Sequence, residues 1–272
     1  MQHCSPCKTP CVVHVRLSTT EGTPLTNVHA YRSLVGALHY LTFTCPDLSF
    51  AVHQVCQFMN APTDIHLIAA KRILRYLQGT LDHGLHYTSG PTTLSAFTDA
   101  DWAGDPNNLR STSGLLVFLG HNPITWSAKK QLTVSRSSTK AEYRALASAS
   151  AEVWWLRVLL RDLGIFIFAP PILWCDNVSD LAIASNPVFH ARTKHIEVDF
   201  HFIRERVLRK DLQVQFVSTA DQLANIFTKG LSSPRFHELQ SKLMVPVDTI
   251  RLRGDDEANG KSCSVSSCTK RQ

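Results

Sequence analysis

The order of strand-like and helix-like segments after Gly90-Pro91 constrains the fold of this chain most strongly. Alternating apolar residues predict a first strand over 94–99, and two further strands follow before Ser137. A long helical pattern comes next, and the last two strand-like runs, 172–175 and 212–217, are separated by helical segments. Hairpin-connected strands followed by helix-separated strands predict a mixed α/β fold, with a five-stranded mixed sheet flanked by helices.

Within this pattern the remaining boundaries are set by turn residues. The second and third strands are expected at 114–119 and 124–127, with 130–135 as an extension of the third. After the long helix, whose apolar stripe runs from Leu146 to Leu163, helices are expected over 178–185, around 196–207, and from Thr219 onward.

The preceding region, residues 30–90, has helical patterns instead. Its apolar spacing predicts helices over 31–43 and 47–59, and a third helix that begins after Pro62-Thr63 and stops at Gly79. Three short helices bury little surface, so this block is marginal as an independent unit. We expect residues 1–29 to be a leader or linker, 91–245 the sheet domain, and 246–272 a disordered tail.

Composition narrows the class of protein. Hydrophobic residues make up 44% of the 272 residues, which excludes wholesale disorder. No apolar run approaches the roughly 18 residues of a membrane helix, and no basic region precedes an apolar stretch as in a secretory signal. The expected location is therefore intracellular, cytoplasmic or nuclear, without a membrane partner.

The cysteines suggest one metal site that we do not favour. Cys4, Cys7, Cys11 and His14 provide four residue types that bind zinc. Their spacing departs from the usual zinc patterns, and the surrounding residues are rich in proline and threonine. A flexible leader with reduced, incidental cysteines is the preferred interpretation.

Three acidic residues occupy positions that suggest a functional site. Asp99 ends the first strand and Asp176 follows the strand 172–175. Glu142 lies four residues before Leu146, on the helix stripe that should face the sheet. A single acidic residue at a strand end is often a solvated loop start, and Glu142 in a first helical turn also suits the helix dipole. Together, however, the three carboxylates are expected to converge.

Converging carboxylates repel one another unless cations lie between them. Mg²⁺ prefers oxygen ligands and keeps several waters, so a few carboxylates suffice, and Mn²⁺ is a similar ion. Two such ions, about 4 Å apart, activate water and stabilise the leaving oxygen in phosphodiester hydrolysis. Asp99, Glu142 and Asp176 are therefore candidate metal ligands and catalytic residues.

Positive charge is concentrated beside Glu142. Lys plus Arg exceed Asp plus Glu by 28 to 22, a net charge of +6. Residues 127–161 hold seven Lys or Arg and two Glu, so this segment has a net charge of +5. A basic face suits a nucleic-acid backbone, although it is also common on ordinary helices. The candidates for this contact are Lys129, Lys130, Arg136, Lys140 and Arg144.

Five motifs occur in an order that is highly specific as a set. They are YRSLVGAL (31–38), RILRYL (72–77), DADWAG (99–104), STKAEY (138–143) and HIEVD (195–199). Over residues 20–245 the chain resembles the C-terminal part of a copia-type LTR retrotransposon Pol polyprotein. Residues 30–88 resemble the end of the reverse transcriptase, its thumb and connecting region, and 93–230 resemble the RNase H domain.

The resemblance implies hydrolysis of the RNA strand of RNA–DNA hybrids with two Mg²⁺ ions, and it assigns the metal ligands to Asp99, Glu142 and Asp176. It also implies a fourth aspartate, where this chain has Asn225. Asp221, four residues earlier, is a candidate substitute because residues at this spacing share a helix face. Asp199, flanked by His195 and His201, ranks lower, since a polar helix face explains that cluster.

Three functions remain open from the sequence. The leading one is an active RNase H, with no polymerase activity because no Tyr-x-Asp-Asp motif occurs. A degenerate remnant that only binds nucleic acid is the alternative, and Asn225 favours it. The helices of 30–88 could also dock onto a separate reverse transcriptase polymerase chain.

Overall fold

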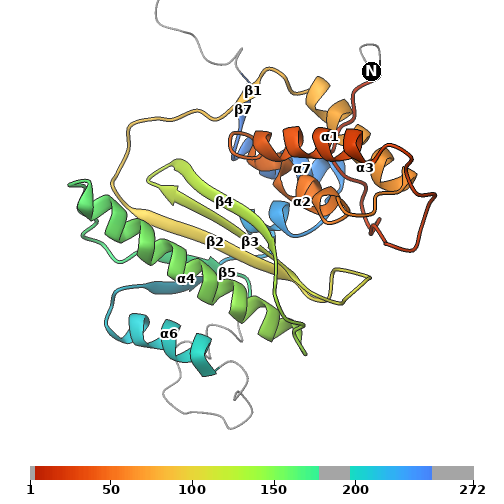
Figure 1. The fold of residues 1–272 in the computed structure, drawn as a ribbon. Coiled ribbons are helices and arrows are strands. Elements are labelled where there is room, and N and C mark those ends of the chain that lie inside the picture. Colours follow the sequence, from red (N-terminus) through yellow and green to blue (C-terminus); the bar gives the residue numbers. More distant parts are fainter. Residues whose placement is uncertain (1–3, 178–196, 247–272) are drawn as a thin grey trace, which may run out of the picture.

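A five-stranded mixed sheet forms the centre of the molecule (Figure 1). The computed structural model describes residues 4–177 and 197–246. The strand order is β4-β3-β2-β5-β6, with antiparallel pairing on the β4 side of β2 and parallel pairing on the β5 side. The strands are β2 (Leu94–Asp101), β3 (Thr112–Leu119), β4 (Asn122–Lys130), β5 (Ile172–Cys175) and β6 (Gln213–Phe216). The predicted α/β architecture is confirmed.

Both faces of the sheet are covered, because successive residues of a strand point to opposite sides. Val117 packs on one face, against α4 (Ser138–Asp162) and α6 (Glu197–Leu208). Its neighbours Leu116 and Phe118 pack on the other face, in a separate apolar cluster. The predicted stripe of α4 is buried from Leu146 to Leu160, whereas Leu163 is exposed at the C-cap.

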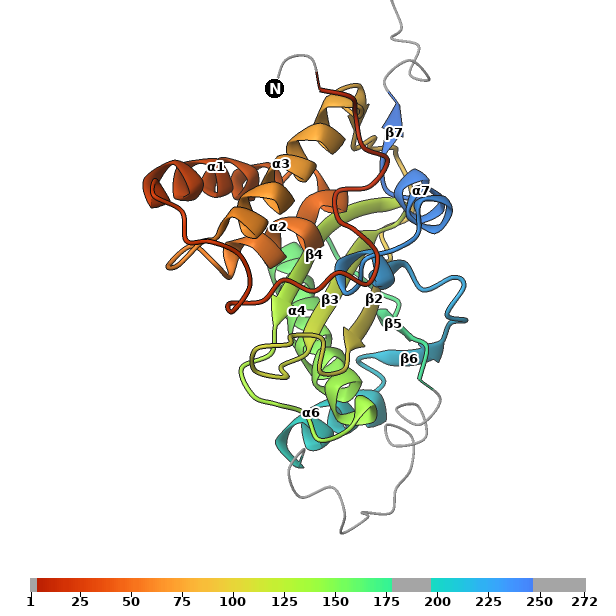
Figure 2. The same ribbon diagram turned by 90° about the vertical axis from the view of Figure 1, so that its right-hand side faces the viewer.

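The N-terminal helices belong to that second cluster. They are α1 (Val28–Leu41), the short 3-10 helix η1 (Pro46–Leu48), α2 (Ser49–Cys56) and α3 (Asp64–Gln78). Their apolar residues pack with η3 (Leu223–Phe227) and α7 (Ser233–Ser241), which come from the far end of the chain. The antiparallel pair of β1 (His83–Gly84) and β7 (Val245–Pro246) closes the same region (Figure 1), and Figure 2 shows β7 following α7. A block that is marginal alone thus shares its core with the C-terminal segment.

The N-terminal segment, predicted from its composition to be a flexible leader, forms hydrogen bonds to α3 through residues 5–9. The segment lies along α3, where the Cys7 N–H donates to the Arg75 carbonyl at 3.1 Å and the Arg75 Nε donates to the Ser5 carbonyl at 2.9 Å. The guanidinium of Arg72 donates to the carbonyl of Thr9 at 3.1 Å and to its hydroxyl at 3.0 Å. Cation-to-backbone bonds of this kind have no periodicity, so the sequence pattern does not reveal them.

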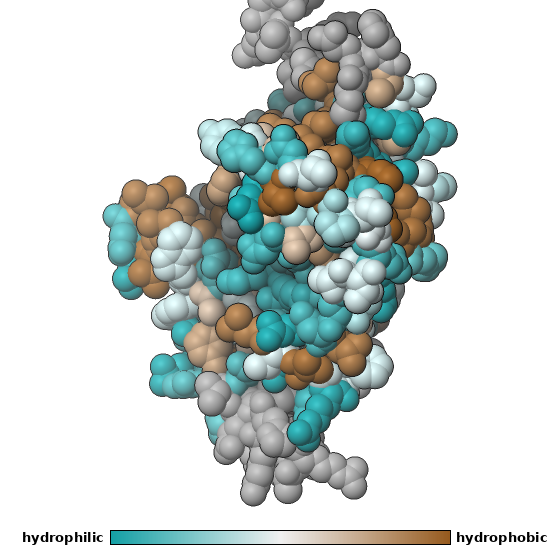
Figure 3. Space-filling model, turned by 45° about the vertical axis from the view of Figure 1, so that its right-hand side comes forward, coloured by the Kyte–Doolittle hydropathy of each residue, from teal (hydrophilic) through white to brown (hydrophobic). Residues whose placement is uncertain are grey.

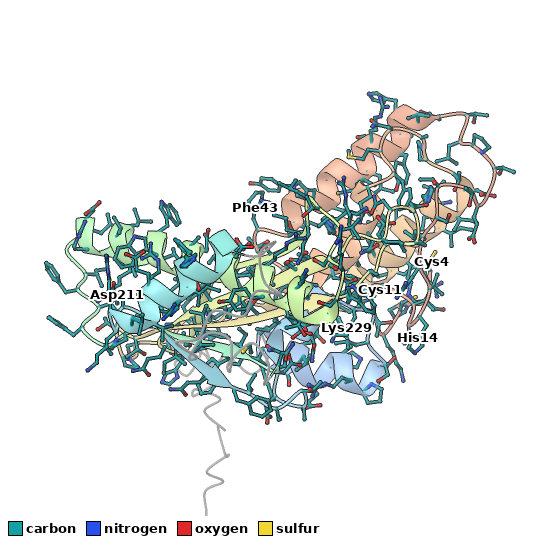
Figure 4. All side chains as sticks on the ribbon, turned by 90° about the horizontal axis from the view of Figure 1, so that it is seen from below. Cys4, Cys11, His14, Phe43, Asp211 and Lys229 are labelled. Carbon is teal, nitrogen blue, oxygen red and sulfur yellow. The ribbon has the colours of Figure 1, made fainter. Side chains whose placement is uncertain are left out.

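Cys4, Cys7, Cys11 and His14, all within the described residues, are not grouped around a common point. Cys4, Cys7 and Cys11 are free thiols, and Figure 4 shows Cys4, Cys11 and His14 spread along the segment. Burial raises the pKa of the Cys11 thiol to about 11, against a smaller lowering by Arg72. A thiol with such a pKa packs as a small apolar side chain at neutral pH.

Several predicted boundaries are wrong. The final helix does not start at Thr219, because the Gln222 side chain caps the short η3 at Ala224 N and a separate helix, α7, starts at Ser233 with a proline in its first turn. The third strand ends at Lys130 instead of extending to 135, and the second helix is split into η1 and α2. The helix expected over 178–185, His195 and the tail from 247 lie outside the described residues.

Within 4–177 and 197–246, no helix combines the length and apolar character that crossing a membrane requires. On the face drawn in Figure 3, hydrophobic residues form separate patches between hydrophilic ones.

Candidate active site

Three aspartates gather at the edge of the sheet where β2 and β5 end. Phe97 pairs with Trp174 in the parallel register, so Asp99 and Asp176 each lie two residues beyond that pair. The Asp99 side chain is 5% exposed. Asp101 follows on the same face of β2, and its Oδ1 accepts a short hydrogen bond from the Thr112 N–H. The carboxyl edge of a parallel strand pair therefore presents a row of carboxylates.

Glu142 comes to this edge from α4. The hydroxyl of Ser137 caps the helix by accepting from the Lys140 N–H at 3.3 Å, which places Glu142 within the first two turns. Ala100, Ala141 and Ala145 form a small cluster of their own between β2 and α4. Because these side chains are small, the start of the helix approaches the end of β2 closely. Glu142 is half-buried there and accepts a hydrogen bond from the Asn177 side chain.

The carboxylates at this edge interact electrostatically. Burial raises the pKa of Glu142 to about 7, and the negative charges of Asp176 and Asp99 add to this rise. The pKa of Asp176 is raised by burial and then by Asp99, while a hydrogen bond from the Thr219 hydroxyl at 3.2 Å opposes the rise. Burial also raises the pKa of Asp101 to about 6, with a further contribution from Asp99. These groups therefore form one interacting acidic cluster.

The short helix η3 closes the site from the other face of the sheet. The buried Gln222 side chain donates to the Thr98 carbonyl at 3.0 Å and so ties η3 to β2. Gly114 lies opposite Asp99 on β3, and a Cβ there would lie 2.9 Å from the Ala224 carbonyl oxygen and 2.8 Å from Thr228 Cγ2. The missing side chain thus permits the close packing of η3 beside Asp99.

Thr228 and Lys229, just after η3, both contact Asp99. The Thr228 hydroxyl donates a short hydrogen bond to Asp99 Oδ2, and the Lys229 Nζ lies 3.3 Å from the same oxygen. Figure 4 shows Lys229 at the opposite end of the sheet from Asp211, which precedes β6. A cation of the chain itself therefore lies at the acidic cluster.

Asn225 is buried within η3, one turn before Lys229. Its Nδ2 donates to the Thr219 carbonyl at 3.2 Å, whereas its buried Oδ1 has no hydrogen-bond partner in the described part of the chain. Carboxylate oxygens and a free amide oxygen are hard ligands of the kind that Mg²⁺ takes, so the donor set fits that ion. Among the described residues, no three His, Cys, Asp or Glu side chains are grouped as tightly as a preformed metal site requires.

Comparison with known proteins identifies the family. The chain is 51% identical over 241 residues to the retrovirus-related Pol polyprotein from transposon RE1 of Arabidopsis thaliana, across 88% of this chain. It is 50% identical over 241 residues to the corresponding RE2 polyprotein and 36% identical over 243 residues to that of transposon TNT 1-94 of Nicotiana tabacum. The chain belongs to the Pol polyproteins of copia-type retrotransposons. It spans 16% of the length of the RE1 polyprotein and 17% of that of RE2.

Solved structures similar to this copia-type Pol segment include RNases H. LC11 RNase H1, isolated from compost, is similar at a TM-score of 0.39 and 16% identity, covering 50% of this chain and 93% of that one. A foamy viral protease–reverse transcriptase in complex with RNA/DNA hybrid has a TM-score of 0.43 and 12% identity, covering 78% and 27%. No family model matches the chain.

The structure does not bring Asp221 or Asp199 into the cluster. Because η3 begins at Leu223, Asp221 and Asn225 do not share a helix face, and the exposed Asp221 accepts instead from the Ser218 hydroxyl at 2.7 Å. Asp199 lies on α6 beside Arg144, whose attraction lowers the pKa of this carboxyl against a larger rise from burial. His201 is on the same helix as Asp199. These two aspartates are therefore poor substitutes for a carboxylate at position 225.

The five basic candidates divide into two groups. Lys130 is used within the chain, since it forms a close ion pair with Asp105 and donates to Gln57 Oε1 at 2.7 Å. Arg144 donates to the Thr133 carbonyl at 3.2 Å and to the Ser135 hydroxyl at 3.0 Å, which supports the loop before α4. The side chains that remain available are Lys129 and Arg136, which are exposed, and the half-buried Lys140.

Sequence reasoning missed two members of the site. Asp101 has a clear signal, because it is two residues from Asp99 in a strand and so points to the same face. Lys229 has a weaker one: it ends the stretch that contains Asn225, but no periodicity links it to Asp99.

Proposed function

We propose that this segment is a metal-dependent ribonuclease H that cleaves the RNA strand of RNA–DNA hybrids. The observation that supports this most is the approach of Asp99, Glu142 and Asp176 to one another from β2, α4 and β5, in a chain of the copia-type Pol family. The three residues come from different elements, and the charge of Asp99 adds to the rise that burial causes in the pKa of both Glu142 and Asp176.

Asp99, Glu142 and Asp176 would hold Mg²⁺, with Mn²⁺ as a substitute, and Asn225 Oδ1 is free to contribute a neutral oxygen. Bound metal ions supply an activated water and stabilise the charge on the leaving oxygen. The chain itself positions these ligands: Thr228 orients Asp99, Thr219 orients Asp176, and Asn177 orients Glu142.

The hybrid would be held through its phosphates. Lys129, Arg136 and Lys140 lie in the stretch that runs from the end of β4 into the first turn of α4, before Glu142 in the chain, and cations on backbone phosphates do not select sequence. Replacing Lys129 and Arg136 by glutamine should weaken hybrid binding equally for different sequences and reduce its salt dependence by about one phosphate contact per residue.

A degenerate site that binds hybrid without cutting it is the second candidate. Asn225 favours it, because the asparagine brings no charge and its amide already bonds to Thr219. Purified chain, incubated with labelled hybrid and Mg²⁺ beside its Asn225→Asp variant, separates the two candidates. Cleavage by both supports the enzyme, cleavage by the variant alone indicates a degenerate site, and failure of both folded, hybrid-binding proteins to cleave excludes a ribonuclease.

A further inference from the structure

Lys229 is the group at the acidic cluster for which the proposed function has no use. Its Nζ lies 3.3 Å from Asp99 Oδ2, and the Asp99 side chain is 5% exposed while that of Lys229 is 43% exposed. The Thr228 hydroxyl donates to the same carboxylate oxygen. One oxygen of a proposed metal ligand is thus engaged twice by neighbouring residues of the same turn.

The positive charge of Lys229 reaches beyond Asp99. It also attracts the carboxylates of Asp101, Glu142 and Asp176. Lys229 therefore acts on these carboxylates electrostatically as a bound cation would, at the edge where β2 and β5 end.

We propose that Lys229 is a tethered counter-ion that holds the acidic cluster together in the metal-free protein and leaves Asp99 when a divalent cation binds. This inference rests on the proposed function and names a positioning residue for its site. An ammonium group and a divalent cation that share one carboxylate oxygen repel each other, so Lys229 competes with a metal ion for Asp99 Oδ2. The flexible four-carbon stem and partial exposure of Lys229 allow the ammonium to move into solvent.

Asn225 shifts this competition toward Lys229. Position 225 lies one turn before Lys229, and its backbone carbonyl accepts from the Lys229 N–H at 3.3 Å. An aspartate there would add a negative charge that attracts a divalent ion more strongly than a monovalent one. With asparagine, the charge to be neutralised is smaller, and Lys229 supplies a larger share of what is needed.

The test is metal affinity, measured by calorimetry with Mn²⁺ in the absence of nucleic acid. Lys229→Met should lower the Kd for Mn²⁺ by about tenfold, because a competing positive charge is removed. Without metal, the same variant should unfold at a lower temperature, since the carboxylates lose their counter-ion. Lys229→Arg keeps the charge and should keep the wild-type affinity within about threefold.

Lys242→Met is the matched control. Lys242 also forms an ion pair, 3.8 Å from Glu238 Oε1, and its side chain is 41% exposed, but it lies at the end of α7. It should leave Mn²⁺ affinity unchanged. Weaker or unchanged affinity in Lys229→Met would overturn the inference. So would a loss of hybrid binding without a change in metal affinity, which would assign Lys229 to phosphate contact.

Asp99→Asn separates this inference from the function on which it rests. Tight Mn²⁺ binding that disappears in Asp99→Asn supports the proposed metal site, whatever Lys229 does. If wild type and Asp99→Asn bind Mn²⁺ equally, both the metal site and the counter-ion role fail. If the site exists but Lys229→Met does not strengthen it, the counter-ion role alone fails.

Discussion

Two buried aspartates, Asp99 at the sheet edge and Asp47 in the helical block, have different partners for their carboxyl groups. Asp47 is 2% exposed, and its Oδ2 accepts from the Tyr76 hydroxyl and from Gln240 Nε2, the latter at 3.2 Å. Asp99 has a hydroxyl and an ammonium group on one oxygen, with other carboxylates around it. Burial alone therefore does not distinguish a functional carboxylate from a structural one.

The neighbours distinguish them. Asp47 joins η1 to α3 and α7 through neutral donors, which fits a role in holding distant segments together. Burial raises its pKa, while Tyr76 and Gln240 act against the rise. At the sheet edge, the charge of Asp99 adds to the rise that burial causes in the pKa values of Asp101, Glu142 and Asp176, and Lys229 acts against each rise. A group of like charges costs stability unless a ligand uses it, so this arrangement points to function.

The largest expected effect is on catalysis at Asp99. Asp99→Asn should reduce hybrid cleavage by on the order of a thousandfold or more, because groups that act as a unit lose nearly all activity together. Hybrid binding, measured by fluorescence anisotropy, should change by less than about threefold, since the phosphates contact other residues. A variant that cleaves at near wild-type rate would exclude Asp99 from the catalytic site.

Asp47→Ala should have the opposite effect to Asp99→Asn, because it should lower stability and leave cleavage intact. It leaves the buried Tyr76 hydroxyl without its acceptor and leaves Gln240 Nε2 with only the Tyr76 hydroxyl oxygen, which costs roughly 1–3 kcal/mol of the free energy of unfolding. Cleavage below the unfolding temperature should persist. Asp162→Ala, which removes an exposed ion pair with Arg161, is the control and should change stability by less than about 0.5 kcal/mol. The measurement is urea denaturation of all three proteins.

The sequence predicted the sheet edge better than the helical block. Strand alternation and the stripe of α4 fix where Asp99, Glu142 and Asp176 must lie, because both periodicities are local. Asp47 was simply a residue near a helix start, and nothing local indicates its pairing with Gln240, 193 residues later. The same holds for the arginines of α3 that bind the N-terminal segment.

The sequence predicted the acidic residues of the site but not the segment that packs against them. Two features come from packing between distant segments: the contact of η3 with Gly114 and the ion pair of Lys229 with Asp99. A helix from Thr219 onward would have put Asp221 and Asn225 on one face, and only the observed start of η3 at Leu223 removes Asp221 from the site.

A smaller effect is expected from Asn225→Asp, which adds a carboxylate to the edge. Without metal, this variant should unfold a few degrees lower, because a carboxylate replaces the amide that donates to the Thr219 carbonyl and adds to the acidic cluster. With Mg²⁺ the order should reverse, with an apparent metal affinity about tenfold higher. Thermal unfolding with and without Mg²⁺ measures both, and Asn108→Asp on an exposed turn is the control. Equal metal response in both variants would show that position 225 does not face the metal.

The smallest effect is a pH dependence of stability that depends on Glu142. Its pKa in the folded protein is about 7 against an ordinary value of 4.5, so the folded state holds a proton that the unfolded chain has released. The contribution of Glu142 to stability is therefore fully present below about pH 4.5 and is lost as the pH rises through 7. Asp101 and Asp176 shift in the same direction in every variant that retains them.

Glu142→Gln isolates this contribution, because glutamine resembles the protonated carboxyl at every pH. In metal-free buffer, its unfolding temperature should equal that of wild type near pH 4.5 and exceed it by a few degrees at pH 8. Glu152→Gln, on the same helix away from the cluster, controls for removal of a charge from α4. Excess Mg²⁺ should abolish or reverse the difference at pH 8, since the metal stabilises the ionised form. A difference that stays constant with pH would mean that Glu142 is solvated, and that the carboxylates of the sheet edge do not interact as a group in the way that distinguishes them from Asp47.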